Sequence, residues 1–171
     1  TNEALTVTGT IDDDSAGDSA LTLTTGIGSV DLQGDAGSTT ALGAFTLASA
    51  SQADLADVTA ASLAVTADNI DLNDATYTAT TGGVTFTGAV DLDAGAVTTS
   101  VDSSAGNGAI AFTSTVDDAA NDTALSLDAG TGTVTMDGAI GGTDGIGTFT
   151  VSAASQADLA DVTADSLAVT A

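Results

Sequence analysis

LTLTT, at residues Leu21–Thr25, returns as LSLDA at Leu125–Ala129, 104 positions further along the chain. Both leucines of the first stretch are retained in the second, whereas the residues that alternate with them change among polar types. Apolar residues that recur at every second position, with polar residues between them, are typical of a β-strand with one buried and one solvated face. These two stretches therefore predict strands. They also show which alternate positions point inward, and the rest of the chain is interpreted in the same way.

The correspondence extends on both sides of these strands. Residues 21–67 align with 125–171 at an offset of 104, and residues 1–13 align with 106–118 at an offset of 105. SVDLQG matches TVTMDG and FTLAS matches FTVSA, with apolar residues of similar volume at alternate positions. We interpret residues 1–171 as a single solenoid segment with about 1.6 copies of a unit of about 104 residues, in which 1–67 is equivalent to 106–171. No signal peptide precedes the first strand pattern, so we expect an internal fragment of a longer chain.

The strand patterns are short, and Gly, Asp, Asn and Ser separate them at intervals of eight to fifteen residues. Two all-β architectures have such frequent turns: antiparallel β-sandwich repeats and a parallel β-solenoid. A long repeat that contains many different strands favours the solenoid, because each copy then forms several stacked turns. We predict a right-handed parallel β-helix, with antiparallel β-sandwich repeats as the alternative.

One segment fits two local structures. In Ala53–Ala67, Leu55 and Val58 are three residues apart and Ala is abundant, so a short helix is an alternative there. A kink at Asp57 that shifts the phase of a strand explains the same spacing, since alternation resumes at Leu63. We predict the strand.

The net charge is −24, and the chain contains no Lys, Arg or His. Nucleic acid is excluded as a partner because phosphate binding depends on basic side chains. Anionic membrane surfaces are excluded for the same reason, and membrane insertion is not expected because no apolar run approaches ~20 residues. The chain also has no Cys, which excludes disulfides and thiolate metal sites.

Catalysis is not expected from this set of residues. Without His, Cys or Lys, only carboxylates and Tyr77 could transfer protons, and no Ser has a base to activate it. Nearly all Asp residues stand in predicted turns or at outward strand positions. We therefore predict that the protein is not an enzyme and has no catalytic or cofactor-binding residue.

Calcium is the one specific ligand that the sequence suggests. IDDDSAGD places Asp12, Asp14 and Asp18 at positions 1, 3 and 7 of an EF-hand-like spacing, with Gly17 at position 6. Leu23 stands where an EF-hand has its bidentate Glu, so an exposed acidic turn without calcium is the alternative. We predict a calcium turn at Asp12, Asp14 and Asp18, with calcium or another divalent cation as the only cofactor in view.

The charge also predicts a diffuse interaction with cations. Turns of roughly 20 to 26 residues stacked at ~4.8 Å give about one negative charge per 1.3 to 1.7 Å of axis, comparable to the ~1.7 Å of duplex DNA. We expect divalent cations to screen such a rod and to bridge neighbouring rods into lateral bundles.

Two longer stretches resemble a known family. They are TALSLDAGTGTVTMDGAIGGTDGIGTFTVSAA at residues 123–154 and ADNIDLNDATYTATTGGVTFTGAVDL at residues 67–92. Both resemble the strand repeats of giant bacterial surface proteins related to filamentous haemagglutinin and the autotransporter adhesins. The resemblance implies a secreted, extracellular or cell-surface β-helix that serves adhesion, filament formation or a biofilm matrix, and it implies no catalytic residue.

The leading functional hypothesis is a structural shaft or filament segment of such a protein, with other repeats or subunits joined end to end. The first alternative is a ligand-binding adhesin module, for which aromatic platforms are expected on the surface. Alternation instead places most of the four Phe and Tyr77 inside. The second alternative is an ice-binding solenoid with outward Thr-x-Thr ranks, although Thr22 and Thr24 change to Ser126 and Asp128 in the second copy.

Overall fold

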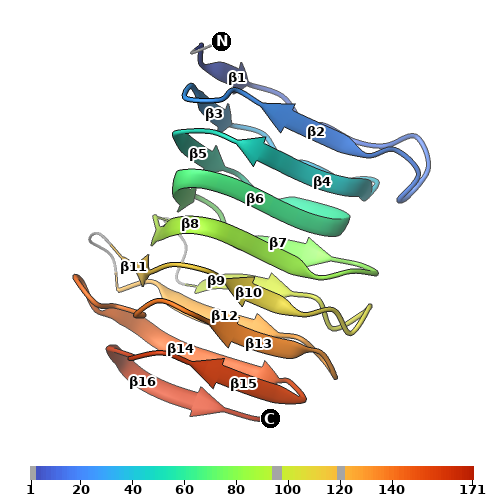
Figure 1. The fold of residues 1–171 in the computed structure, drawn as a ribbon. Coiled ribbons are helices and arrows are strands. Elements are labelled where there is room, and N and C mark those ends of the chain that lie inside the picture. Colours follow the sequence, from blue (N-terminus) through green and yellow to red (C-terminus); the bar gives the residue numbers. More distant parts are fainter. Residues whose placement is uncertain (1–2, 94–97, 119–121) are drawn as a thin grey trace.

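The chain forms an all-β parallel solenoid with no helix in the part of the chain that the structure describes (Figure 1). The computed structural model describes residues 3–93, 98–118 and 122–171. The strands join into one sixteen-stranded sheet, and each pairing between named strands is parallel. The predicted parallel β-helix is thus confirmed, and the antiparallel sandwich is wrong. No described segment is a helix with the length and hydropathy of a membrane span.

The strands have the following bounds in chain order: β1 (Leu5–Val7), β2 (Leu21–Thr24), β3 (Ser29–Leu32), β4 (Leu42–Ser49), β5 (Gln52–Leu55), β6 (Val58–Leu72), β7 (Thr76–Ala79), β8 (Val84–Leu92), β9 (Thr98–Asp102), β10 (Ile110–Phe112), β11 (Val116–Asp117), β12 (Ala124–Asp128), β13 (Thr133–Met136), β14 (Ile146–Ala153), β15 (Gln156–Leu159) and β16 (Ala164–Val169).

Strand pairing divides the solenoid into three faces, which the chain visits in the same order in each turn. The first face contains β1, β3, β5, the end of β6, the end of β8, and β11. The second contains the start of β6, then β7, β9, β12, β14 and β16. The third contains β2, β4, the middle of β6, the start of β8, β10, β13 and β15. One turn takes from 17 residues (Ala53 to Ile70) to 26 residues (Val84 to Ile110).

Strand β6 shows how the chain passes from one face to the next. Its start pairs with β7, its middle with β4 and β8, and its end with β5 and β8. The 15 residues of β6 therefore bend around two corners without leaving strand conformation. The segment Ala53–Ala67 is strand on both sides of Asp57, so the helical alternative is wrong and Asp57 marks a corner.

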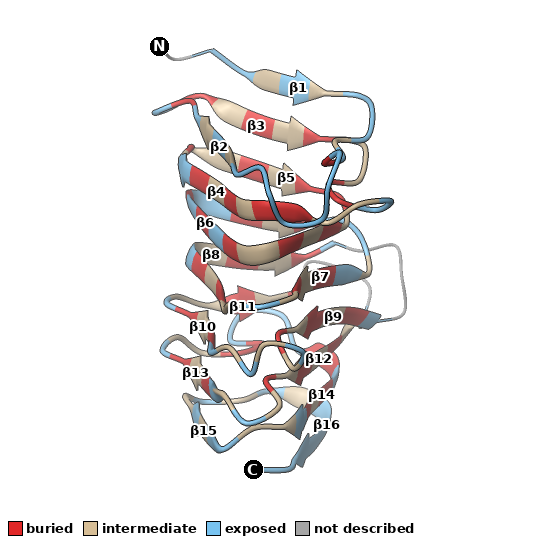
Figure 2. Ribbon diagram, turned by 90° about the vertical axis from the view of Figure 1, so that its right-hand side faces the viewer, coloured by how far each residue is buried: buried red, intermediate tan, exposed pale blue. Residues whose placement is uncertain are grey.

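The core is one column of apolar side chains between the three faces. Buried residues alternate with half-buried or exposed ones along the strands, as Figure 2 shows for β4, β6 and β8. The four Phe and Tyr77 are all buried, as predicted for most of them, and Phe86 contacts both Tyr77 and Phe112 with ring centroids 6.1 and 5.0 Å apart. The Tyr77 hydroxyl donates a 2.7 Å hydrogen bond to the carbonyl of Leu55. Burial thus leaves the one phenol of the chain with a partner.

The two copies of the repeat have the same strand register but lie on different faces. Leu5 pairs with Val30 on the first face, and its equivalent Ile110 pairs with Val134 on the third. Four turns lead from Leu5 to Val90 on the first face, and the chain then crosses the second face and reaches Ile110 on the third. The length of the repeat is therefore not a whole number of turns. The second copy begins two faces further round the solenoid than the first.

Candidate functional site: an acidic ladder on the first face

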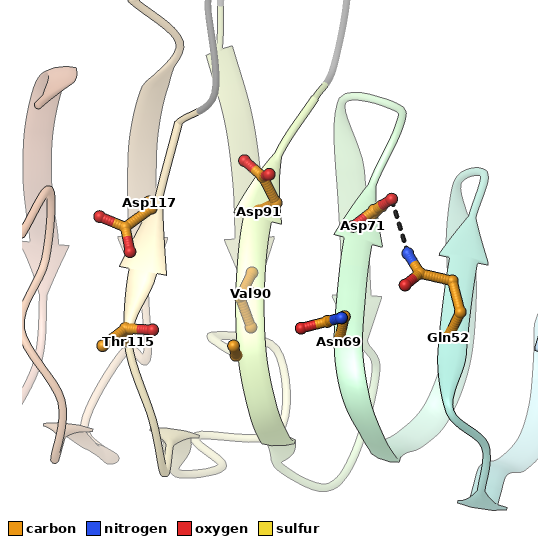
Figure 3. A pocket seen from close by; sticks show the side chains of 8 residues that line it. Gln52, Asn69, Asp71, Val90, Asp91, Thr115 and Asp117 are labelled. Carbon is orange, nitrogen blue, oxygen red and sulfur yellow. Dashed lines mark hydrogen bonds between the residues drawn. The ribbon is translucent and has the colours of Figure 1, made fainter. Parts of the chain in front are cut away.

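Aspartates occupy the same outward position on five successive turns of the first face. The pairings place Asp31 beside Asp54, Asp54 beside Asp71, Asp71 beside Asp91, and Asp91 beside Asp117. Neighbouring strands lie ~4.8 Å apart, so these carboxylates follow the solenoid axis at about that spacing. We call this row the acidic ladder. Figure 3 shows Asp71, Asp91 and Asp117 of the ladder on adjacent strands.

Two glutamines bind the ladder. Gln52 Nε2 donates to Asp54 Oδ1 at 3.1 Å and to Asp71 Oδ2 at 2.7 Å, and so joins two successive turns (Figure 3). Gln33 Nε2 donates to Asp31 Oδ2 at 2.8 Å within one turn. Since the chain has no basic side chain, amide groups are the side-chain donors that partly balance these carboxylates.

Asp71 differs from an ordinary carboxylate in its affinity for protons. Partial burial, a shared hydrogen bond with Asp54 and the charges of Asp54 and Asp91 raise the pKa of Asp71 to about 6, against the opposing bond from Gln52. Two like charges one strand apart cannot both ionise without cost, so the pair retains a proton above the usual range of Asp. Asp71 therefore binds a proton at mildly acidic pH.

A shallow groove of about 310 Å³ runs beside the ladder. The residues that line it are Gln52, Asn69, Asp71, Ala89, Val90, Asp91, Thr115 and Asp117. The groove offers oxygen acceptors and two amides but no nucleophile with an adjacent base. The described residues contain no group of three or more acidic side chains that could hold one metal ion. The arrangement can attract hydrated cations along its length by charge.

The predicted calcium turn is not gathered around a common point. Asp12 Oδ1 accepts hydrogen bonds from the backbone N–H groups of Thr39 and Thr40, at 2.8 and 3.1 Å, which lower the pKa of Asp12. Asp14 and Asp18 lie exposed in the turn that follows. The metal role of Asp12, Asp14 and Asp18 stays a prediction, and the structure gives Asp12 a structural partner in the next turn.

Asp13, which the calcium spacing passes over, organises this turn. It is buried, and its carboxylate accepts hydrogen bonds from Ser19 N at 2.7 Å and Asp14 N at 2.9 Å. The bond from Ser19 is the main reason that the pKa of Asp13 is lowered. In the second copy, the equivalent Asp118 is buried and accepts a bond from Thr123 N. One buried Asp thus accepts the backbone hydrogen bonds of this turn in each copy.

The third face contrasts with the ladder. Its outward column from β2 to β13 contains only Thr and Ala, namely Thr22, Thr46, Ala64, Thr85, Ala111 and Thr135. Thr135 is the repeat equivalent of Asp31, so a ladder residue is replaced by an uncharged one where the repeat meets the third face. The replacement is not general, because Asp158, the repeat equivalent of Asp54, keeps its carboxylate on the third face beside Thr135.

A recurring triplet in the sequence marks the ladder, although it can be recognised only when the number of residues in each turn is known. An apolar residue, Asp and Leu recur as VDL, ADL, IDL and VDL at residues 30–32, 53–55, 70–72 and 90–92. The same triplet occurs as ADL at residues 157–159, where it lies on the third face. Comparison with family models, with curated proteins and with solved structures finds no match to this chain.

Proposed function

We propose that this chain is a structural shaft segment of a secreted bacterial cell-surface or matrix protein, of the kind found in filamentous haemagglutinin-like adhesins. The observation that carries the proposal is the equal strand register of the two copies on different faces. The same strands stack in the same register on different faces of the solenoid. The solenoid can therefore lengthen by repetition of the sequence without a new type of contact between turns. A sequence without Lys, Arg, His or Cys fits a mechanical role.

The extracellular location rests on the sequence. The family resemblance implies it, and a chain without Lys or Arg offers no cleavage site to trypsin-like proteases. The tight core adds resistance to other proteases, because cleavage requires local opening of strands whose apolar side chains are buried.

Force spectroscopy on the chain, held between two reference domains, tests the shaft role. We expect cooperative unfolding at a definite force, since the column of side chains links each turn to the next. Leu63→Asp places a charge at a position that is 1% exposed and should lower that force strongly. Ala64→Asp places the same charge on the neighbouring outward position of β6 and serves as the matched control. Extension of the unmodified chain at low force, like an unfolded polymer, would contradict the proposal.

Ice binding is a second candidate, favoured by the uncharged outward column of the third face. Thr22 and Thr46 are in register, as are Thr66 and Thr87, on neighbouring turns. Ala64 interrupts the outward column of Thr residues between Thr46 and Thr85. A thermal hysteresis assay decides this candidate: freezing-point depression beyond the colligative value that is lost in Thr85→Glu supports it, and its absence from the unmodified chain removes it.

A further inference from the structure

One corner between the second and third faces contains an Asn-Gly dipeptide. Asn107 and Gly108 lie between β9 and β10, and Thr131 lies between β12 and β13 on the next turn (Figure 1). Asn107 is the only Asn of the sequence that Gly follows. Asn is one of the thermolabile residues of proteins, and its side chain reacts most readily with the backbone nitrogen of a following glycine, because glycine has no Cβ atom to hinder the attack.

The corner requires both residues of this dipeptide. Asn107 has a φ of 53°, a left-handed conformation that Asn tolerates better than most residues with a side chain. A Cβ atom on Gly108 would lie 2.0 Å from the carbonyl oxygen of Gly82 on the preceding turn, so the position needs glycine. The close stacking of the turns therefore creates a chemically labile dipeptide.

We propose that Asn107 is a site of spontaneous deamidation through a cyclic imide, and that opening of this corner sets the rate. In the first step the Gly108 nitrogen gives up its proton and forms a bond to Asn107 Cγ. The bond from Cγ to Nδ2 then breaks, and Nδ2 leaves as ammonia with the proton that Gly108 gave up. Water hydrolyses the imide at either carbonyl carbon and leaves aspartate or isoaspartate. The inference goes beyond the shaft function and does not depend on it.

Hydrogen bonds in the folded corner hold the reacting atoms in other arrangements. The Gly108 N–H donates to the carbonyl oxygen of Ser103 at 3.1 Å, and Ser103 Oγ donates to the carbonyl oxygen of Gly108 at 2.8 Å. Asn107 Oδ1 accepts hydrogen bonds from Thr131 N and Thr131 Oγ1, both at 2.9 Å, which hold the side chain against the next turn. Ring closure requires the Gly108 nitrogen to face Cγ in a near-attack geometry, so these bonds must open first.

The bonds from Thr131 have a second effect, of opposite sign. Two donors on Oδ1 resemble an oxyanion hole, because negative charge develops on that oxygen when Cγ is attacked. Such donors accelerate only an attack that the geometry permits, and the Gly108 nitrogen is bound to Ser103. We therefore expect the geometry to prevail, so that the folded corner slows the reaction.

The two products differ in their effect on the stack. Aspartate keeps an oxygen that Thr131 can bind, and it adds one negative charge at an exposed position. Isoaspartate inserts a methylene group into the backbone directly before Gly108, whose close approach to Gly82 depends on the path of that backbone. Formation of isoaspartate should therefore lower the stability of the solenoid, and the aged chain should unfold at a lower urea concentration than the fresh one.

Peptide mass analysis of the chain, aged at mildly alkaline pH with and without urea, tests the proposal. A protease that cleaves before Asp releases residues 102–116, which contain no other Asn and no Gln. The mass gained when a carboxyl group replaces the amide measures the reaction. The same protease cuts this peptide again before a new aspartate but not before isoaspartate, which separates the products. The folded chain should react at least about tenfold more slowly than the chain in urea, because the corner must open first.

Three variants test the contacts of the corner. Thr131→Val removes one of the two bonds to Oδ1 and should raise the rate in the folded chain about two- to tenfold, as expected for the loss of one hydrogen bond. Thr131→Ser keeps the hydroxyl and is the matched control, with the rate of the unmodified chain. Asn107→Gly suits the positive φ and should show no mass gain in this peptide. Circular dichroism checks that each variant keeps its strands, and both Thr131 variants should react like the unmodified chain in urea.

Three results would overturn the proposal. Equal rates in the folded chain and in urea would show that the corner gives no protection. A slower reaction in folded Thr131→Val would show that Thr131 acts as an oxyanion donor and does not restrain the side chain. A folded chain whose peptide 102–116 gains no mass has no modification site at Asn107. Each of these results leaves the shaft function intact, because the force measurement does not depend on this residue.

Discussion

Asp71 carries the most unusual titration in the acidic ladder. The pKa of Asp71 is about 6 in the folded chain, because of burial and the neighbouring Asp54, against about 4 for an ordinary Asp. Between these values the folded chain binds more protons than the unfolded chain, so stability falls as pH rises from about 4 to about 6. Well above pH 6 the Asp71 side chain is ionised in the folded and unfolded chains alike, and the destabilisation caused by its charge is complete.

Asp71→Asn should therefore stabilise the protein at pH 7, because the amide removes the charge and can still bind Gln52. We expect a gain of about 1 kcal/mol in the free energy of unfolding, less than the full shift implies because solvent that reaches the side chain screens its charge. The gain should vanish below pH 4. Urea unfolding at pH 7 and pH 3.5 measures it, and Asp137→Asn, at an exposed position, controls for general charge removal. An equal gain in the control would contradict the role of the ladder.

Asp12 and Asp13 act in the opposite direction at acidic pH. Backbone N–H donors, from Thr39 and Ser19 respectively, lower the pKa of each carboxyl group. Their contribution is present above the usual pKa of Asp and is lost as pH falls through the lowered value. The stability of the whole chain should therefore pass through a maximum at mildly acidic pH, between the region set by these two residues and that set by Asp71.

At the scale of the element, the corners fix where one face ends and the next begins. Gly37 has a φ of 76° and its repeat equivalent Gly141 a φ of 64°, a region that other residues rarely adopt. A Cβ atom on Gly37 would lie 2.0 Å from the carbonyl oxygen of Thr59, and one on Gly141 2.1 Å from that of Thr163. The corner therefore needs glycine for both its backbone conformation and its close approach to the next turn.

Gly37→Ala should lower the free energy of unfolding by about 1 to 3 kcal/mol, because the new methyl group meets a backbone atom that cannot move alone. Gly9→Ala is the matched control: a Cβ atom on Gly9 would have no other atom within 4 Å, so alanine should be accepted there with little change. Urea unfolding of both variants measures the difference. Equal midpoints would show that the corner relaxes freely.

The sequence predicted the strands well and their partners poorly. Alternation in LTLTT and FTLAS identified the inward residues, because side-chain direction in a strand depends only on local order. Pairing depends on how many residues each turn takes, and corners and loops vary this number from 17 to 26. The wrap of β6 around three faces was also hidden, since a bend at Asp57 and a short helix give similar spacing of Leu55 and Val58.

The acidic ladder was missed for the same reason. Asp31 and Asp54 are 23 residues apart, and Asp54 and Asp71 only 17, so no fixed period aligns them. A calcium turn was predicted at Asp12 instead, because the carboxylates of that turn are close together in the sequence. In a solenoid, however, residues one turn apart are nearest neighbours in space, and sequence proximity is a poor guide to a binding surface.

For the molecule as a whole, the net charge of −24 predicts a strong response to salt. Repulsion among the 24 carboxylates opposes the compact state, and counterions relieve it. We expect the midpoint of thermal unfolding to rise by several degrees when NaCl increases from about 10 mM to about 150 mM.

Divalent cations should act more strongly than this screening alone. CaCl₂ or MgCl₂ at matched ionic strength is expected to raise the midpoint further and to increase light scattering as neighbouring rods are bridged. Thermal unfolding and scattering measured on the same samples check both effects. If calcium and sodium give the same curves at matched ionic strength, the ladder has no preference for divalent ions and lateral bundling is excluded.

The mismatch between the repeat and the turn has a mechanical consequence. A beam whose cross-section keeps one weak side along its whole length bends toward that side, and it curls under load. Here each copy presents its thin corners and its long loops two faces further round, so three copies distribute every soft side evenly about the axis. A rod assembled in this way has no easy plane of flexure, and it should stay straight under thermal agitation over lengths at which an in-phase stack would arc.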